Sequence, residues 1–445
     1  MSLLESAPLA RVRGISLALS LGVLPACPAP RSPGSGAVDG RVIEVGRAGS
    51  ALAGIAARGP TVFASLGAAR PVASTAIEAF APGATAARPT WRTDLAGFGG
   101  PLAVSGGIVV AALGGSGTVA GMALRGEPGA AVAGLDASTG SVAWKLAIDA
   151  TEWAAISSLA ATSDGVLVGG SFSGTLRIAD RVVSSGGRAD GFVARISAAG
   201  ALGWVIRVGG PGADSVAGVA ASGDRIAIAG TFAAGADVLG QPLAAFDERS
   251  LHADAFVAEL DAAGALRWAR SFGGKADEAV AGLAIDHAGR IAVAATIRDT
   301  VHLGETDLVA TGPSAGLVAW WLPGGNPGPT ILLGGSELDG LRGITAAGDH
   351  VIVAGFYSGS LHLGDRSVTA SGGDDAFLVE LAPGAVVRSW PITGDGREEI
   401  TALASFDGGF LAGLAHTTAA RIDDDKLPSP SDPMTGAAIV VRALR

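Results

Sequence analysis

Short apolar segments alternate with turns rich in glycine and aspartate along the chain, and this alternation repeats with a long period. Seven segments consist of small residues around one larger apolar side chain, and successive copies lie 47, 57, 60, 64, 61 and 59 residues apart. The seven larger side chains are Ile55, Leu102, Leu159, Val219, Leu283, Ile344 and Leu403. A repeat of this length that contains only strand patterns predicts a radial or stacked β architecture.

The clearest copy of the repeat predicts four antiparallel strands, with polar turns between the first two and between the last two. These strands are expected over residues 216–221, 225–230, 254–260 and 266–272. Tryptophan stands near the start of the fourth strand in several copies, as Trp91, Trp144, Trp204, Trp268 and Trp390. One bulky ring at a fixed place in each repeat is typical of side chains that fill the wedge between propeller blades. An aromatic ladder that binds a ligand is the alternative interpretation.

The two ends of the chain carry matching parts of one repeat. The last third-strand pattern covers residues 438–444 without a fourth strand after it, whereas residues 41–46 resemble the fourth strand at 204–209. We expect the N-terminal strand to complete the last blade, because this pairing removes an exposed sheet edge. An open solenoid would need capping repeats, and the sequence shows none. The sequence therefore predicts an all-β, seven-bladed β-propeller with four-stranded antiparallel blades.

The third strand and its surroundings follow a recognisable motif. Residues 254–261 read Asp-Ala-Phe-Val-Ala-Glu-Leu-Asp and are followed by Trp268 and then Gly273-Gly274, and a second copy has residues 190–196, Trp204 and Gly209-Gly210. This pattern resembles the bacterial seven-bladed β-propeller repeat family, abbreviated SBBP. The resemblance is strong over 190–300 and 375–396 and weaker before 130. It implies the propeller fold and carries no catalytic residues with it.

Composition narrows the possible partners. The chain of 445 residues is 49% hydrophobic and 16% charged, has 69 Gly and 22 Pro, and carries a net charge of −10 with a pI near 5.1. An acidic chain without a basic patch does not favour binding to nucleic acid or to anionic lipid headgroups. We therefore expect no nucleic-acid partner.

The N-terminal segment has the layout of an export signal. Arg11 and Arg13 precede an apolar run over 15–24 that is too short to span a membrane as a helix. The following Leu24-Pro25-Ala26-Cys27 resembles the lipobox of bacterial lipoproteins, which implies lipidation of Cys27. The expected organisation is a signal peptide over 1–26, a flexible tether over 27–40 and a propeller over 41–445. An ordinary signal peptide cleaved after Ala26 and a cytosolic location are the alternatives.

The remaining variable segments lie between the second and third strands of several repeats. Residues 174–183, 301–308 and 361–368 each predict a β-hairpin with a tight polar turn. In a propeller, these hairpins emerge on the same face as the turns that lead from one blade to the next. Function carried by loops is expected on that face.

An acid recurs four residues before the first-strand glycine position in four repeats, as Asp214, Glu278, Asp339 and Glu398. We expect these acids near the mouth of the central funnel, where carboxylates could contact a ligand or a hard cation such as calcium. The alternative is that they solvate the turn. The run Asp423-Asp424-Asp425 is interpreted as a solvated charge cluster.

The sequence contains no recognised catalytic, phosphate-binding or zinc-binding motif, so no catalytic residue, metal site or cofactor is predicted. His302 and His362 occupy equivalent hairpin positions. Residues 134–145 resemble the blade motif of quinone-dependent propeller dehydrogenases, but only one full copy is present, and we interpret it as shared propeller sequence.

Two functions remain open. The first is an exported, lipid-anchored, monomeric binding or scaffolding module for a protein or glycan at the bacterial envelope, whether at the outer membrane, in the periplasm or on the cell surface. The second is a glycoside hydrolase or lyase that acts on an extracellular polysaccharide through the four funnel acids. Two carboxyl groups about 5 to 10 Å apart in an open cleft would favour the second function.

Overall fold

The computed structural model describes residues 40–45, 50–68, 73–81, 88–247, 252–406, 409–423, 425–427 and 436–443. The predicted signal peptide, Cys27 and all of the predicted tether except Gly40 lie outside these residues. Every regular element in the described part is a β-strand. In the same part, no helix is long and apolar enough to cross a membrane.

Seven antiparallel sheets form the blades, and each contains four main strands. In blades 1 and 2 these are β2 (Ser50–Arg58), β3 (Thr61–Ala68), β4 (Ser74–Phe80) and β5 (Trp91–Ala96), then β6 (Phe98–Ser105), β7 (Ile108–Gly115), β10 (Gly129–Asp136) and β11 (Val142–Ala150). In blades 3 and 4 they are β12 (Trp153–Thr162), β13 (Gly165–Ser173), β16 (Asp190–Ser197) and β17 (Leu202–Gly209), then β18 (Ser215–Ser222), β19 (Arg225–Phe232), β22 (Asp254–Asp261) and β23 (Leu266–Gly274). In blades 5 and 6 they are β24 (Ala279–Ile285), β25 (Ile291–Ile297), β28 (Ala315–Trp321) and β29 (Pro327–Gly335), then β30 (Asp339–Ala347), β31 (His350–Tyr357), β34 (Asp375–Ala382) and β35 (Ala385–Gly394). Blade 7 contains β36 (Glu398–Phe406), β37 (Gly409–His416), β40 (Gly436–Ala443) and β1 (Gly40–Val45).

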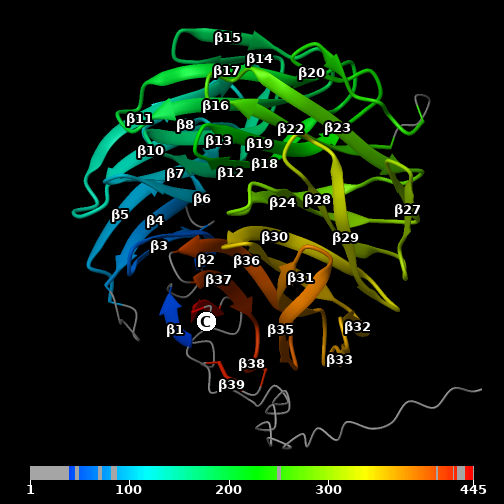
Figure 1. Ribbon diagram of the computed structural model, residues 1–445. Coiled ribbons are helices and arrows are strands. Elements are labelled where there is room, and N and C mark those ends of the chain that lie inside the picture. The colour runs from blue at the N-terminus through cyan, green and yellow to red at the C-terminus, as the bar shows by residue number, and fades with distance from the viewer. Residues whose placement is uncertain are drawn as a thin grey trace, which may run out of the picture. The chain divides into compact units, whose positions relative to one another are not determined.

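The blades follow one another around a common centre, and the first strand of each blade lies innermost (Figure 1). Each first strand contacts the first strand of the next blade, and β36 of blade 7 contacts β2 of blade 1. The seven-bladed propeller is therefore confirmed, and the ring is closed.

Closure of the ring uses the N-terminal strand as expected. The strand β1 pairs antiparallel with β40, with Val42 opposite Val440 and Ile43 opposite Ile439. Ile43 and Ile439 are both buried in the core that blade 7 shares with blade 1. The two chain ends therefore supply the outer half of one blade, and no covalent bond is needed to join them (Figure 1).

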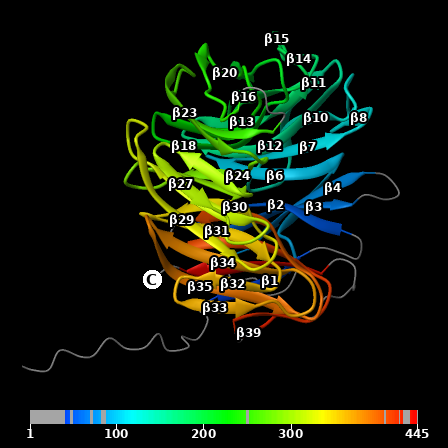
Figure 2. The same ribbon diagram turned by 90° about the vertical axis from the view of Figure 1, so that its right-hand side faces the viewer.

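Six small hairpins lie between second and third strands. They are β8 (Thr118–Val119) with β9 (Met122–Ala123), β14 (Thr175–Ile178) with β15 (Arg181–Ser184), β20 (Asp237–Val238) with β21 (Gln241–Pro242), β26 (Thr300–Leu303) with β27 (Thr306–Val309), β32 (Ser360–Leu363) with β33 (Arg366–Thr369), and β38 (Ala420–Ile422) with β39 (Asp425–Lys426). The last five extend the fourth strand of the preceding blade, so that five sheets have six strands rather than four. In blade 4, for example, Gly273 and Gly274 pair with His302 and Val301. These five hairpins therefore cover blade edges at the rim (Figure 2).

Apolar cores lie between consecutive blades. The core between blades 4 and 5, for example, contains Phe272 of β23 and Trp321 of β28. The fourth-strand tryptophans close the same wedges: Trp144 Nε1 donates to Ala198 O at 2.8 Å, from blade 2 to blade 3. A Cβ on Gly200, which has φ +83°, would lie 2.6 Å from the Trp144 ring. This arrangement agrees with the wedge-filling interpretation of the tryptophans.

Candidate functional site

The central channel is the main cavity candidate, with a volume of about 470 Å³ and walls formed by all seven first strands. Most lining residues are Ala, Gly, Val, Leu or Ile, and the hydroxyl-bearing ones are Ser157, Ser158, Thr345, Thr401 and Ser405. Each first strand has a register shift at an equivalent position. Such a bulge leaves an unpaired residue on the inner strand, and bulges commonly redirect a side chain toward a site.

Arg342 is the only charged side chain among the described residues that line the channel. It is the bulged residue of β30, since the register shifts between Leu341 and Gly343. Its guanidinium lies over the Phe356 ring, 4.6 Å from the centroid. Its Nε is 3.7 Å from Glu399 Oε1, and Glu399 Oε2 is 3.8 Å from Arg397 Nη2. Both contacts exceed hydrogen-bond length, and the Arg342 side chain is 41% exposed.

The four recurring acids occupy a different place from the one we expected. Asp214, Glu278, Asp339 and Glu398 are 3%, 3%, 0% and 1% exposed, and none lines the channel. They lie beneath the turns that lead from one blade to the next. Each acid lies just before or at the start of a first strand. It is therefore buried in the junction between two blades and does not project from the funnel mouth.

Each of three acids lies close to an aspartate that opens the third strand of the preceding blade. The pairs are Asp190 with Asp214, Asp254 with Glu278, and Asp375 with Glu398. At the fourth junction Ser314 replaces the aspartate, and its Oγ donates to Asp339 O at 2.6 Å. The third-strand aspartates are buried as well.

A glycine makes room for these carboxyl groups. A Cβ on Gly209 would lie 2.7 Å from Asp214 Oδ2 and 2.9 Å from Asp190 Oδ1. A Cβ on Gly394 would collide with the Glu398 carboxyl group. Gly209 and Gly394 therefore provide space for buried acids at their junctions.

Burial dominates the electrostatics of the junctions. Burial, and after it the nearby Asp254 carboxyl, raise the pKa of Glu278 to about 8. Burial and the contact with Asp375 raise the pKa of Glu398 to about 8. Burial also raises the pKa of Asp339 to about 6, opposed by a backbone hydrogen bond from Gly335.

Backbone N–H groups face the aspartates of these pairs. Asp214 accepts hydrogen bonds from Gly210 N and Ala233 N, both at 2.8 Å, and Asp375 accepts one from Ser371 N at 2.9 Å. Amide donors stabilise an anion and compete with a cation for the same oxygens. In the described part of the chain, no group of three or more His, Cys, Asp or Glu side chains is arranged to hold a metal ion. The amide-bonded aspartates serve as structural acceptors, and a calcium contact at the four acids stays a prediction.

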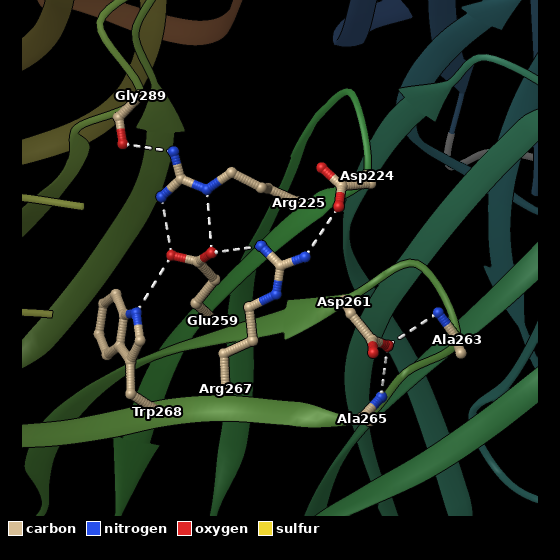
Figure 3. A network of polar contacts seen from close by, with 9 residues as sticks. All are labelled: Asp224, Arg225, Glu259, Asp261, Ala263, Ala265, Arg267, Trp268 and Gly289. Atoms are coloured by element: carbon tan, nitrogen blue, oxygen red, sulfur yellow. Dashed lines mark hydrogen bonds and ion pairs between the residues drawn. The ribbon is translucent and has the colours of Figure 1, made fainter. Parts of the chain in front are cut away.

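A second polar network lies toward the end of β22 that is remote from Asp254 (Figure 3). Glu259 is 3% exposed and accepts hydrogen bonds from Arg225, Arg267 and Trp268. Arg225 also donates to Gly289 O of blade 5 at 2.6 Å. The buried Glu259 carboxylate is paired on both oxygens, so this network joins two blades instead of presenting a reactive group.

The other singled-out residues are bound in local contacts. His302 Nδ1 lies 2.6 Å from Asp307 Oδ1, and its ring stacks on Phe246 with centroids 4.6 Å apart. Asp423 Oδ1 lies 3.0 Å from Arg366 Nη1, so part of the predicted charge run forms an ion pair. Asp424 is outside the described residues.

The sequence reasoning missed two features of the site. The aspartates that pair with the recurring acids open the repeated Asp-Ala-Phe motif, so the signal was present at Asp254 and Asp375. Arg342 was also visible as a large charged residue at a position that holds Ala, Ser or Thr in most other copies.

No protein-family model matches the chain, and no curated protein does. Among solved structures, it is similar to the β-propeller domain of the Trilobed protease from Pyrococcus furiosus, with 11% identity and a TM-score of 0.46 over 86% of this chain and 97% of that chain. The Dos1 propeller shares 10% identity with a TM-score of 0.45 over 90% and 94%. An ulvan lyase of polysaccharide lyase family PL25 shares 10% identity with a TM-score of 0.47 over 90% and 94%. At these identities the likeness concerns the fold alone.

Proposed function

We propose that this protein is a non-catalytic binding module of the bacterial envelope, related to the SBBP repeat proteins. Export and membrane attachment rest on the basic and apolar N-terminal segment and on the lipobox-like Leu24-Pro25-Ala26-Cys27. A lipid on Cys27 would hold the propeller at the membrane through the tether that follows.

The observation that carries the binding proposal is the exposed guanidinium of Arg342, the one charged group that the described residues place on the channel wall. Arg342 is held over Phe356 and has only a loose contact with Glu399, so N–H donors remain for a ligand. A planar guanidinium matches the two oxygens of a carboxylate or a sulfate. The proposed partner is therefore a protein or glycan that presents an anionic group to the channel mouth.

The geometry supports binding better than polysaccharide cleavage. The four acids that a hydrolase or lyase would use are buried beneath the blade junctions, and none lines the channel. Their close carboxyl neighbours lie in the same covered places rather than across an open cleft. We therefore propose no second function.

The test compares crosslinking and pull-down from native envelopes for the wild type, Arg342→Ala and Arg58→Ala. Arg58 is an exposed arginine at the other end of a first strand, so its variant matches the loss of charge on the opposite face. We expect Arg342→Ala to weaken partner capture about tenfold or more, because truncating a central interface arginine commonly costs over 1 kcal/mol. We expect Arg58→Ala to capture the partner normally. Equal capture by both variants would contradict the channel-mouth site, and intact protein in the soluble cytoplasmic fraction would contradict the envelope location.

A further inference from the structure

Two blade junctions hold pairs of carboxyl groups that have been removed from water. Glu278 N donates to the carbonyl before Asp254 at 3.0 Å between blades 4 and 5, and Glu398 N donates to the carbonyl before Asp375 at 3.1 Å between blades 6 and 7. All four side chains are buried, and neither oxygen of Glu278 or Glu398 has a hydrogen-bond partner. A buried carboxyl oxygen without a donor is costly, so these sites require an explanation.

The chemistry of the facing carboxyl groups indicates that each pair requires a proton between them. Ionised carboxylates are acceptors only, so two of them cannot hydrogen-bond to each other. A single proton on one of them converts the contact into a hydrogen bond and removes one buried charge. Asp375 is already held as an acceptor by Ser371 N, and Asp254 by Phe246 N at 2.6 Å. The glutamates are therefore the better place for the proton.

The other two junctions limit the buried negative charge in a different way. Between blades 3 and 4, Arg207 Nη1 lies 2.9 Å from Asp190 Oδ2 and supplies a positive charge beside the Asp190 and Asp214 pair. Between blades 5 and 6, Ser314 stands in place of the first acid, so only Asp339 is left. These junctions serve as internal comparisons, because one has a cation and the other has a single acid.

Among the described residues, no other arginine or lysine forms an ion pair with the carboxyl groups of these two pairs. Those around the Asp254 and Glu278 pair are Asp247, His252 and Asp277. Those around the Asp375 and Glu398 pair are Tyr357, Arg366, Asp374, Asp395 and, opposite Glu398 on β37, His416. Arg366 is engaged with Asp423 at 3.0 Å, and His416 Nδ1 lies 2.8 Å from Thr418 O.

We propose that Glu278 and Glu398 are neutral carboxylic acids in the folded ring and that each donates its proton in a hydrogen bond to the aspartate of the preceding blade. Two of the blade junctions are then locked by a proton. The lock between blades 6 and 7 has a special position, because blade 7 is the blade that joins the two chain ends.

The pKa values of the two glutamates, raised to about 8, agree with this arrangement. An unfolded glutamate titrates near 4.3, so the folded ring binds more protons than the unfolded chain between about pH 4 and pH 8. The contribution of each lock to stability is complete below the unfolded pKa and is lost as the pH rises through the folded pKa. The stability that each lock contributes therefore falls progressively between about pH 4 and pH 8.

The experiment uses thermal unfolding of the full chain from pH 5 to pH 9, for the wild type and a Glu278→Gln, Glu398→Gln double variant. Glutamine keeps the shape and donates a hydrogen bond at every pH. We expect the unfolding constant of the wild type to rise by up to about tenfold per pH unit per lock from pH 5 to about pH 8 and to level off above it, and the rise to be smaller in the double variant. Glu337→Gln, which changes an exposed acid, should follow the wild type.

A second measurement does not depend on the variants. Infrared spectra of the folded wild type at pH 7 should show a protonated carboxyl band that disappears with a titration midpoint near pH 8. The absence of that band at pH 7 would overturn the proposal. So would identical pH dependence in the wild type and the double variant, or stabilisation of the wild type at pH 8.5 by calcium chloride that the double variant lacks, which would indicate a cation at these carboxyls instead.

Discussion

At the scale of single residues, the packing between blades depends on tryptophan rings that lie against glycines of the next blade. Trp144 of blade 2 lies against Gly200 in a turn of blade 3, and the same contact joins Trp204 to Gly264 and Trp268 to Gly325. Each of these glycines has a positive φ and little or no space for a Cβ. The tryptophan and the glycine are therefore one unit, although they belong to different repeats.

Gly200→Ala tests this unit against Gly223→Ala. Both glycines have a positive φ, but a Cβ on Gly223 would meet nothing within 4 Å. Both variants should lose about 1 kcal/mol of unfolding free energy from backbone strain, and Gly200→Ala should lose about 1 to 3 kcal/mol more because it displaces the Trp144 ring. Chemical denaturation measures the difference. Equal losses would show that the contact adds nothing to stability.

At the scale of elements, the hairpins belong to two blades at once. The hairpin of β26 and β27 comes from the sequence of blade 5 and pairs with β23 of blade 4. Its Val301 side chain is fully buried in the core shared by these blades. The five hairpins that extend blades 2 to 6 therefore cover outer strand edges and also tie each of these blades to the next, which limits their freedom as display loops.

Val301→Asp should detach this hairpin, because it places a charge in the apolar core. We expect a loss of about 3 kcal/mol in unfolding free energy and faster hydrogen exchange at the end of β23. Val309→Asp is the matched control, since Val309 lies on the same hairpin and is 56% exposed; it should stay within about 0.5 kcal/mol of the wild type. Unchanged exchange at β23 in Val301→Asp would contradict the covering role.

At the scale of the whole propeller, stability depends on joining the two ends of the described chain. Without β1, blade 7 would keep β36, β37 and β40, and the outer edge of β40 would be unpaired. Such an edge is a template for pairing with another chain. The apolar contacts of Ile43 and Val45 with the core beside blade 1 would be lost as well.

Removal of residues 1–45 should therefore lower the melting temperature and promote aggregation, whereas removal of residues 1–39 should leave both unchanged. The two truncations differ only by the residues of β1. Differential scanning calorimetry and light scattering provide the measurements. If the longer truncation melts like the shorter one, closure by β1 does not stabilise the ring.

The repeat and its strands could be predicted because their signals are local and periodic. The strands at 254–260 and 266–272, and the match between 41–46 and 438–444, follow from apolar runs and turns that are read along the chain. The recurrence of acids such as Glu278 and Glu398 was visible in the same way. These features depend on neighbours in sequence, so the tertiary structure confirmed the strands and closure without changing them.

Whether an acid is solvated or buried depends on what packs against it from another blade, and only the tertiary structure decided this. Glu398 is buried near Asp375 at the junction between blades 6 and 7. The two side chains come together because the blades pack against each other, and their spacing along the chain does not reveal this contact. In the same way, β26 pairs with the preceding blade, and Arg342 is the charged side chain that reaches the channel wall. Sequence periodicity determined the ring, and contacts between blades determined which of its polar residues are structural and which remain accessible to a ligand.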